Sequence, residues 1–180
     1  MHTFQSARRH NSPERGSTIV VALIVLSALL MAGTITIVKV QRGTRASSQA
    51  RFQSIALFAA ESGIASGMEF LRTNVDPIAY FGAFISPNNS SVQTPPGIAG
   101  NSMAYLDPGN VFSGDTEMSY EVSVLNNAED PGFAVGDDTD AVVTLRSVGK
   151  GPGTSSVVLE VSVDASSSGP LQIIRWRVIE

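Results

Sequence analysis

The sequence predicts an α+β fold, in which a long N-terminal helix, transmembrane in its first part, packs on a mostly antiparallel β-sheet of about four strands. Three observations support this prediction. Residues 17–38 carry no charge, residues 43–72 continue without proline, and residues 117–180 contain segments of alternating apolar and polar side chains. Helix and strands that are segregated along the chain in this way are typical of α+β domains.

The uncharged run of residues 17–38 has the length of a membrane-spanning helix. At about 1.5 Å per residue, it covers the ~30 Å hydrocarbon layer of a bilayer. A secretory signal has an apolar region of about 7–15 residues and a small-residue cleavage site, whereas this run is longer and has no such site. Three arginines precede the run, against Lys39 and Arg42 behind it, so the positive-inside rule predicts a cytoplasmic N-terminus and an exported remainder.

Residues 39–72 are predicted to continue the helix as an amphipathic segment in the periplasm. Their apolar side chains recur at helical spacing, at Leu57, Ile64, Met68 and Leu71. No proline interrupts residues 43–72. The sequence therefore predicts one continuous helix from the membrane into the outer part of the protein.

Small residues gather on one part of this helix. Gly63 and Gly67 form a G-x-x-x-G pattern, and Ala59 extends the same face, which permits close approach of another backbone. Three interpretations stay open: packing on the outer domain, a contact in a filament core, and a local bend. Glu61 is either a solvated carboxylate or a contact with another subunit.

The outer part begins with a connector and ends in strands. Residues 73–116 are predicted to be a variable surface loop, because Pro, Gly, Asn and Ser dominate after Asp76-Pro77. Residues 117–180 are predicted to form the sheet, with GKGPGTS (residues 149–155) as a hairpin turn. The expected core positions are Val143, Leu145, Leu159, Val161 and Val163, and the expected apolar face of the last strand is Ile174, Trp176 and Val178, opposite Arg175 and Arg177.

Composition excludes several kinds of function. Residues 1–42 hold five Lys or Arg against one acid, and residues 43–180 hold seven against fifteen. An acidic folded part argues against nucleic-acid binding, which requires a basic face. Cysteine is absent, and the two histidines, His2 and His10, lie in the first ten residues, so thiol chemistry and, beyond those residues, a Ser-His-Asp triad are excluded. We predict that the protein is not an enzyme.

The candidate metal ligands are the acidic residues of AEDPGFAVGDDTD, residues 128–140, namely Glu129, Asp130, Asp137, Asp138 and Asp140. Asp137, Asp138 and Asp140 offer the oxygen ligands that calcium prefers, although the segment lacks the EF-hand pattern. A solvated acidic loop and a calcium site both stay open. Acid-base chemistry by Asp137 and Asp138 in a hydrolase is a third reading of the same residues.

The N-terminal residues resemble the type IV pilin family. A short basic leader ending at Gly16, the pair Ser17-Thr18 and the apolar helix are similar to a class III signal, and FAAESGI (residues 58–64) resembles PilX-type minor pilins. The resemblance implies a pilin-like fold. It also implies that a prepilin peptidase removes residues 1–16, that Ser17 becomes N-methylated, and that the apolar helix is kept as membrane anchor and assembly element.

Val21 stands where major pilins of this family carry glutamate, at the fifth mature position. The absence of this glutamate is typical of PilX-type minor pilins and GspK-type pseudopilins. The resemblance implies a minor pilin that helps initiate and caps a type IV pilus, located in the bacterial inner membrane and then at the pilus tip. Its implied partners are other minor pilins, the major pilin, the prepilin peptidase, the inner-membrane assembly platform, membrane lipid and a large tip adhesin. The alternatives are a GspK-type pseudopilin of type II secretion and an uncleaved single-pass protein with an exported binding domain.

Overall fold

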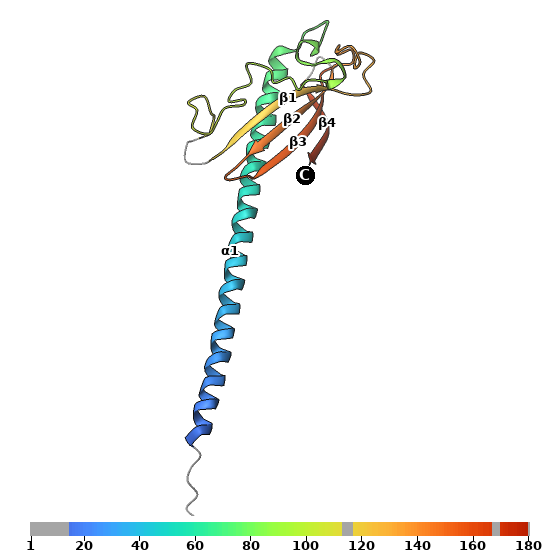
Figure 1. The fold of residues 1–180 in the computed structure, drawn as a ribbon. Coiled ribbons are helices and arrows are strands. Elements are labelled where there is room, and N and C mark those ends of the chain that lie inside the picture. The colour runs from blue at the N-terminus through green and yellow to red at the C-terminus, as the bar shows by residue number, and fades with distance from the viewer. Residues whose placement is uncertain (1–14, 113–116, 167–169, 180) are drawn as a thin grey trace, which may run out of the picture. The chain divides into compact units, whose positions relative to one another are not determined.

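The computed structural model describes residues 15–112, 117–166 and 170–179 (Figure 1). The chain divides into two units, residues 1–46 and 47–180. The helix α1 (Arg15–Asn74) contributes residues to both. Most of the predicted leader, residues 1–14, lies outside the described residues.

In the first unit, α1 exposes its apolar side chains. The large apolar residues between Ile19 and Val38 are 43 to 67% exposed. Among the described residues, α1 is the one helix whose length and composition allow it to cross a membrane, with a mean hydropathy of 2.6 in its most apolar 18-residue window. A long apolar N-terminal helix that can serve as a membrane anchor is therefore confirmed.

Hydroxyl groups in this apolar segment are satisfied within the helix. Ser27 donates to the carbonyl of Ile24 at 2.8 Å, and Thr34 donates to Met31 at 2.8 Å. Thr36 likewise donates to the carbonyl of residue 32 at 2.9 Å. A hydroxyl that bonds the preceding turn needs no water, so these side chains suit a hydrocarbon environment.

The second unit contains a four-stranded antiparallel sheet in the order β1-β2-β3-β4. Each strand pairs with the next in sequence, and the β3-β4 register shifts between Ser162 and Val163. This confirms the predicted α+β class and the number of strands. The strands are β1 (Ser119–Asn126), β2 (Val142–Lys150), β3 (Ser156–Asp164) and β4 (Gln172–Ile179), and two short 3₁₀ helices, η1 (Gly82–Phe84) and η2 (Pro87–Asn89), precede them.

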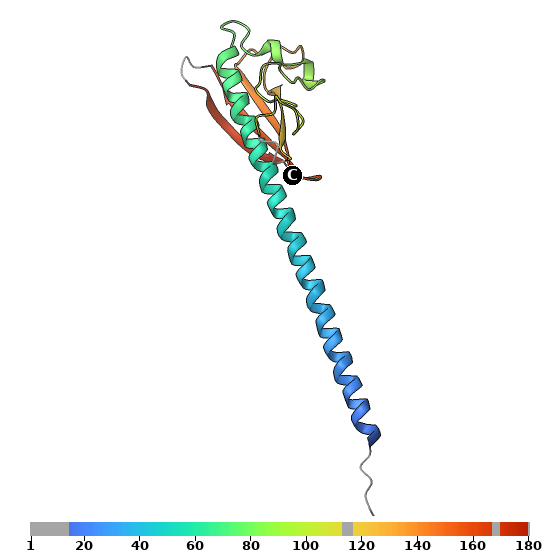
Figure 2. The same ribbon diagram turned by 90° about the vertical axis from the view of Figure 1, so that its left-hand side faces the viewer.

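The core of this unit lies between α1 and one face of the sheet (Figure 2). The five residues predicted for the core, Val143, Leu145, Leu159, Val161 and Val163, are all completely buried. The helix contributes positions spaced three and four apart, as one face of a helix requires. These buried helix residues are Ala56, Ala59, Ala60, Gly63, Ile64, Gly67, Phe70 and Leu71.

The connector between α1 and β1 contributes to this core. We expected it on the surface, but Phe81, Ile85 and Ile98 are buried in the main apolar cluster. The expectation was wrong at these positions because three apolar side chains in a Pro- and Gly-rich segment carry no periodic signal. They are buried by contacts with residues far away in the sequence.

The apolar face of β4 departs from its expected burial. We expected Ile174, Trp176 and Val178 to pack under the helix, yet they are 58, 47 and 51% exposed. The helix α1 comes close to the sheet at Gly63 and Gly67, and these glycines lie against β1 and β2. The helix therefore leaves the inner face of β4 uncovered.

The connector also covers the free edge of β1. Val124 donates its N–H to the carbonyl of Gln93 at 3.2 Å, and Ser102 donates to the carbonyl of Tyr120 at 2.9 Å. The Asn101 side chain bonds both backbone groups of Val122, accepting from its N–H at 2.6 Å and donating to its carbonyl at 3.1 Å. Asn89 makes the same paired contact with residue 126. The connector thus takes the place of a fifth strand.

Removing the Asn101 amide should destabilise this edge. Asn101→Ala leaves the N–H and carbonyl of Val122 without partners, which we expect to lower the free energy of unfolding by about 2 kcal/mol. Denaturant unfolding followed by Trp176 fluorescence measures the change. Gln93→Ala is the matched control, because the Gln93 side chain is exposed and donates a hydrogen bond to Ser91 rather than to β1. Equal stability of the two variants would contradict the edge-covering role.

Candidate functional site

The small residues of α1 lie against the sheet. A Cβ atom on Gly63 would lie 3.0 Å from Val122 Cγ2 and still closer to Ser147 Oγ, and one on Gly67 would lie 3.1 Å from Val122 Cγ1. Ala59 is fully buried on the same face. Among the three interpretations of this face, the geometry therefore favours packing on the outer domain.

One further glycine completes this contact and was not foreseen. Gly149 was expected in a hairpin turn, but β2 extends through it to Lys150. A Cβ on Gly149 would lie 2.8 Å from Ala60 Cα and closer still to the backbone of Ala56. The turn begins later than expected because this close approach holds Gly149 in the strand opposite Tyr120.

The other residues singled out on α1 point to the exterior. Glu61 is exposed on the second unit, as expected of a solvated carboxylate. Val21 is exposed in the apolar segment. Gly16 and Ser17 belong to the first turn of α1, and the exposure of these two residues lies outside what the structure describes. The cleavage and methylation assigned to them stay predictions.

Three of the five candidate acidic residues form a cluster. Asp130, Asp138 and Asp140 bring carboxylate oxygens within 4.8 Å of one another. Asp137 is exposed and does not belong to this group. Asp130 lies beside Asp138 because the turn after residue 130 folds back, so that Thr139 donates both its N–H and its hydroxyl to the Asp130 carboxylate, at 2.9 and 2.6 Å.

Every carboxylate oxygen in this cluster accepts a hydrogen bond. Asp138 accepts from the backbone N–H of Phe81 at 3.1 Å and of Ala141 at 2.9 Å. Asp140 accepts from the N–H of Val142 and from the Asn127 amide, both at 2.9 Å. Asp130 also accepts from the N–H of residue 132. The cluster therefore ties the connector and the β1–β2 loop together.

The two buried carboxylates of the cluster have shifted pKa values in opposite directions. Burial raises the pKa of Asp138 to about 6, with a smaller contribution from the charge of Asp140. Burial also acts to raise the pKa of Asp130, but the hydrogen bonds from Thr139, Gly132 and Asn126 outweigh it and leave the pKa below its ordinary value. One carboxylate is thus stabilised as an anion and the other is not.

A bound calcium ion at this cluster stays a prediction. The donor set is chemically suitable, because carboxylate and amide oxygens are calcium ligands. The side-chain oxygens of Asn126 and Asn127 are buried and have no hydrogen-bond partner among the described residues. The sequence included Asp130 among five candidate acidic residues. It did not indicate that Asp130 rather than Asp137 lies beside Asp138, because seven residues without regular periodicity separate Asp130 from Asp138.

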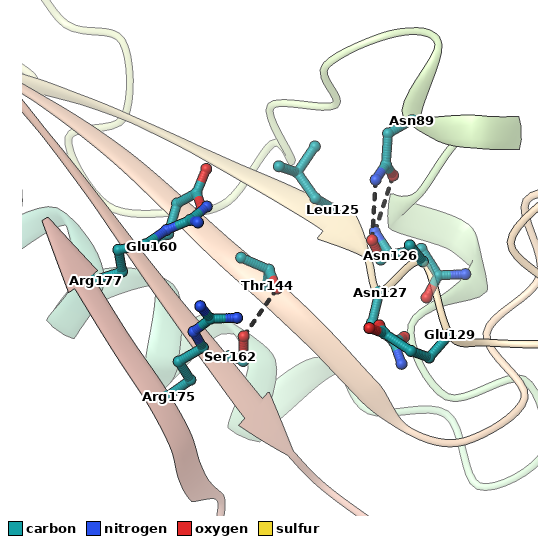
Figure 3. A pocket seen from close by; sticks show the side chains of 11 residues that line it. Asn89, Leu125, Asn126, Asn127, Glu129, Thr144, Glu160, Ser162, Arg175 and Arg177 are labelled. Carbon is teal, nitrogen blue, oxygen red and sulfur yellow. Dashed lines mark hydrogen bonds and ion pairs between the residues drawn. The ribbon is translucent and has the colours of Figure 1, made fainter. Parts of the chain in front are cut away.

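A polar pocket of about 310 Å³ lies on the other face of the sheet, away from α1 (Figure 3). Thr144 and Ser162 share a hydrogen bond of 3.1 Å at its floor. Arg177 pairs with Glu160 at 2.5 Å, and Arg175 also lines the pocket. Hydroxyl and guanidinium groups in this arrangement suit recognition of a polar or acidic segment.

No family model, curated protein or solved structure matches this chain.

Proposed function

We propose that this protein is a minor pilin that helps initiate assembly of a type IV pilus and caps it. The proposal assigns the protein to the bacterial inner membrane, with its N-terminus in the cytoplasm and residues 39–180 in the periplasm, before it moves to the pilus tip. Its mechanism is packing between subunits rather than catalysis. The partners are other minor pilins, the major pilin, the prepilin peptidase, the assembly platform and a large tip adhesin.

The observation that carries the proposal is the apolar half of α1. It follows Arg15-Gly16 directly, carries no charge over residues 17–38 and exposes its large side chains. Such a surface requires lipid or other apolar helices around it. A helix that first lies in the membrane and then among sister helices meets that requirement at both stages.

Val21 supports a position at the filament tip. A glutamate in hydrocarbon is costly unless a cation meets it, and in the pilin family it is thought to attract the amino terminus of a neighbouring subunit. A subunit with Val21 lacks that attraction. A subunit at the tip has no subunit above it, so it depends least on the contact between this glutamate and a neighbouring amino terminus.

Two alternatives share the same helix. A GspK-type pseudopilin of type II secretion would be processed in the same way, so its neighbouring genes would encode a secretin and other pseudopilins instead of a tip adhesin. An uncleaved single-pass protein with an exported binding domain would retain Met1. The mass of the native polypeptide separates this second alternative from the proposal.

Processing after Gly16 gives the decisive test. We expect mass spectrometry of the chain recovered from membranes, and separately from sheared filaments, to find an N-methylated N-terminus at Ser17. Gly16→Leu should leave the full-length chain unprocessed. Gly33→Leu is the matched control, since Gly33 lies in the same apolar helix and an added Cβ would meet nothing within 4 Å beyond the helix's own nearby backbone. A native chain that retains Met1, or one without residues 17–38, would overturn the proposal.

A further inference from the structure

The two edges of the sheet are treated differently by the rest of the chain. The connector hydrogen-bonds along the outer edge of β1 through Gln93, Asn101 and Ser102. The outer edge of β4 receives no hydrogen bond from the described residues, and its backbone pairs only with β3. Free edges are templates for another strand, and natural sheets normally block them. A chain that blocks one edge leaves the other available to a partner.

The inner face of β4 is also uncovered. Trp176 and Val178, which pair with the buried Val161 and Leu159, are about half exposed, and so are Ile173, which pairs with the buried Val163, and its neighbour Ile174 at the register shift. At the opposite edge, Tyr120, Val122 and Val124 are at most 1% exposed. Figure 1 shows β4 as the outermost strand of the sheet. A strand added beside β4 would cover part of this apolar surface and satisfy its backbone groups at the same time.

An apolar recess lies beside the end of this strand. It has a volume of about 650 Å³ and lies between α1 and the start of β3. Leu57, Val157 and Val158 line it, together with Ile179 at the end of β4. Because Ile179 belongs both to the recess and to the open strand, an added segment can place an apolar side chain there.

The opposite face of β4 specifies the charge of the partner. Arg177 is paired with Glu160, whereas Arg175 forms no ion pair with any described residue. Both arginines stand out in a part of the chain that holds seven basic residues against fifteen acidic ones. An acidic side chain across from Arg175 would form a favourable cross-strand pair.

A second copy of this chain fits the edge poorly. The antiparallel two-fold register centred on Trp176 pairs Ile174 of one copy with Val178 of the other, but it also sets Arg175 opposite Arg177. Like charges directly opposite each other destabilise a strand pair. Pairing of β4 with the β1 edge of another copy is blocked, because the connector already occupies that edge.

We propose that β4 is a docking edge that receives an extended segment of another protein as a fifth strand. The segment would alternate apolar residues, facing Ile174, Trp176 and Val178, with Asp or Glu residues, one of them facing Arg175. The inference rests on the sheet of residues 47–180 and holds whether or not the protein is a pilin.

The test uses the full-length protein in detergent micelles and two synthetic peptides of about ten residues. One alternates glutamate with valine and the other alternates lysine with valine. Trp176 is the only tryptophan of the chain, so its fluorescence reports on β4 directly. We expect the acidic peptide to shift the Trp176 emission to shorter wavelength and to slow hydrogen exchange at β4 amides. It should bind roughly fivefold more tightly than the basic peptide.

Charge reversal makes the test specific. Arg175→Glu should reverse the preference between the two peptides, with hydrogen exchange of β2 amides showing that the fold is intact. Arg72→Glu, on the exposed side of α1, changes the net charge equally and should leave the preference as it was. Absence of protection at β4, or equal binding of both peptides, would overturn the proposal. Protection of β4 that grows with protein concentration without peptide would also overturn it, in favour of self-association.

Discussion

Gly149→Ala should lower the free energy of unfolding by about 3 kcal/mol or more, the largest loss we expect from a single methyl group in this protein. The added carbon would meet the backbone of Ala56 and Ala60 at less than 3.0 Å. Backbone atoms have no alternative rotamer, so α1 and β2 must move apart along a close-packed contact. The midpoint of thermal unfolding, followed by Trp176 fluorescence, should fall by roughly 10 °C.

Substitutions at two other glycines should change the free energy of unfolding by less than Gly149→Ala. Gly82→Ala is the matched control in the same unit, because its nearest neighbour would be the Asp138 nitrogen at 3.7 Å, and we expect a change within about 0.5 kcal/mol. Gly63→Ala should fall between the two, since the nearest group is the Ser147 hydroxyl, which is able to rotate. A Gly149→Ala protein as stable as Gly82→Ala would show that the helix and the sheet are not in this close contact.

Asp138→Asn should change how stability depends on pH. Burial raises the pKa of Asp138 from 3.8 to about 6 in the folded protein. The folded state therefore holds a proton in this range that the unfolded state has lost, so the contribution of Asp138 to stability is fully present below pH 3.8 and is lost as the pH rises through about 6. Asparagine is neutral throughout. Between about pH 4 and pH 7.5, the unfolding free energy of the variant should gain about 3 kcal/mol relative to the natural protein.

The comparison of pH profiles is robust against other effects of the substitution. Asparagine accepts only one of the two bonds that Phe81 and Ala141 donate to Asp138, which lowers stability by a similar amount at every pH. Asp137→Asn is the control, because Asp137 is the exposed neighbour outside the cluster. Parallel profiles for the natural protein and Asp138→Asn would show that the pKa of Asp138 is not raised in the folded state.

Short-range patterns in the sequence were sufficient to predict the order and type of the elements. The uncharged run at residues 17–38 required a helix able to span a membrane, because every backbone group must be satisfied within the segment. Alternation along β1, β2 and β3 predicted one wet face and one buried face, and Val143 and Leu145 are buried as that period requires. Helix and strand periods repeat every few residues, so they are visible without knowledge of the fold.

Only the tertiary structure decided which residues meet across long distances in the chain. Asp138 is held by the N–H of Phe81, 57 residues away, and Asn101 covers the edge of β1 from a connector without periodicity. The folded chain also brings Asp130, and not Asp137, beside Asp138 and Asp140, and it leaves β4 uncovered. Alternation in β4 specified which side chains share a face, but whether that face is buried depends on where α1 crosses the sheet. That crossing is fixed by the close approach of Gly63, Gly67 and Gly149, a packing property of the assembled fold.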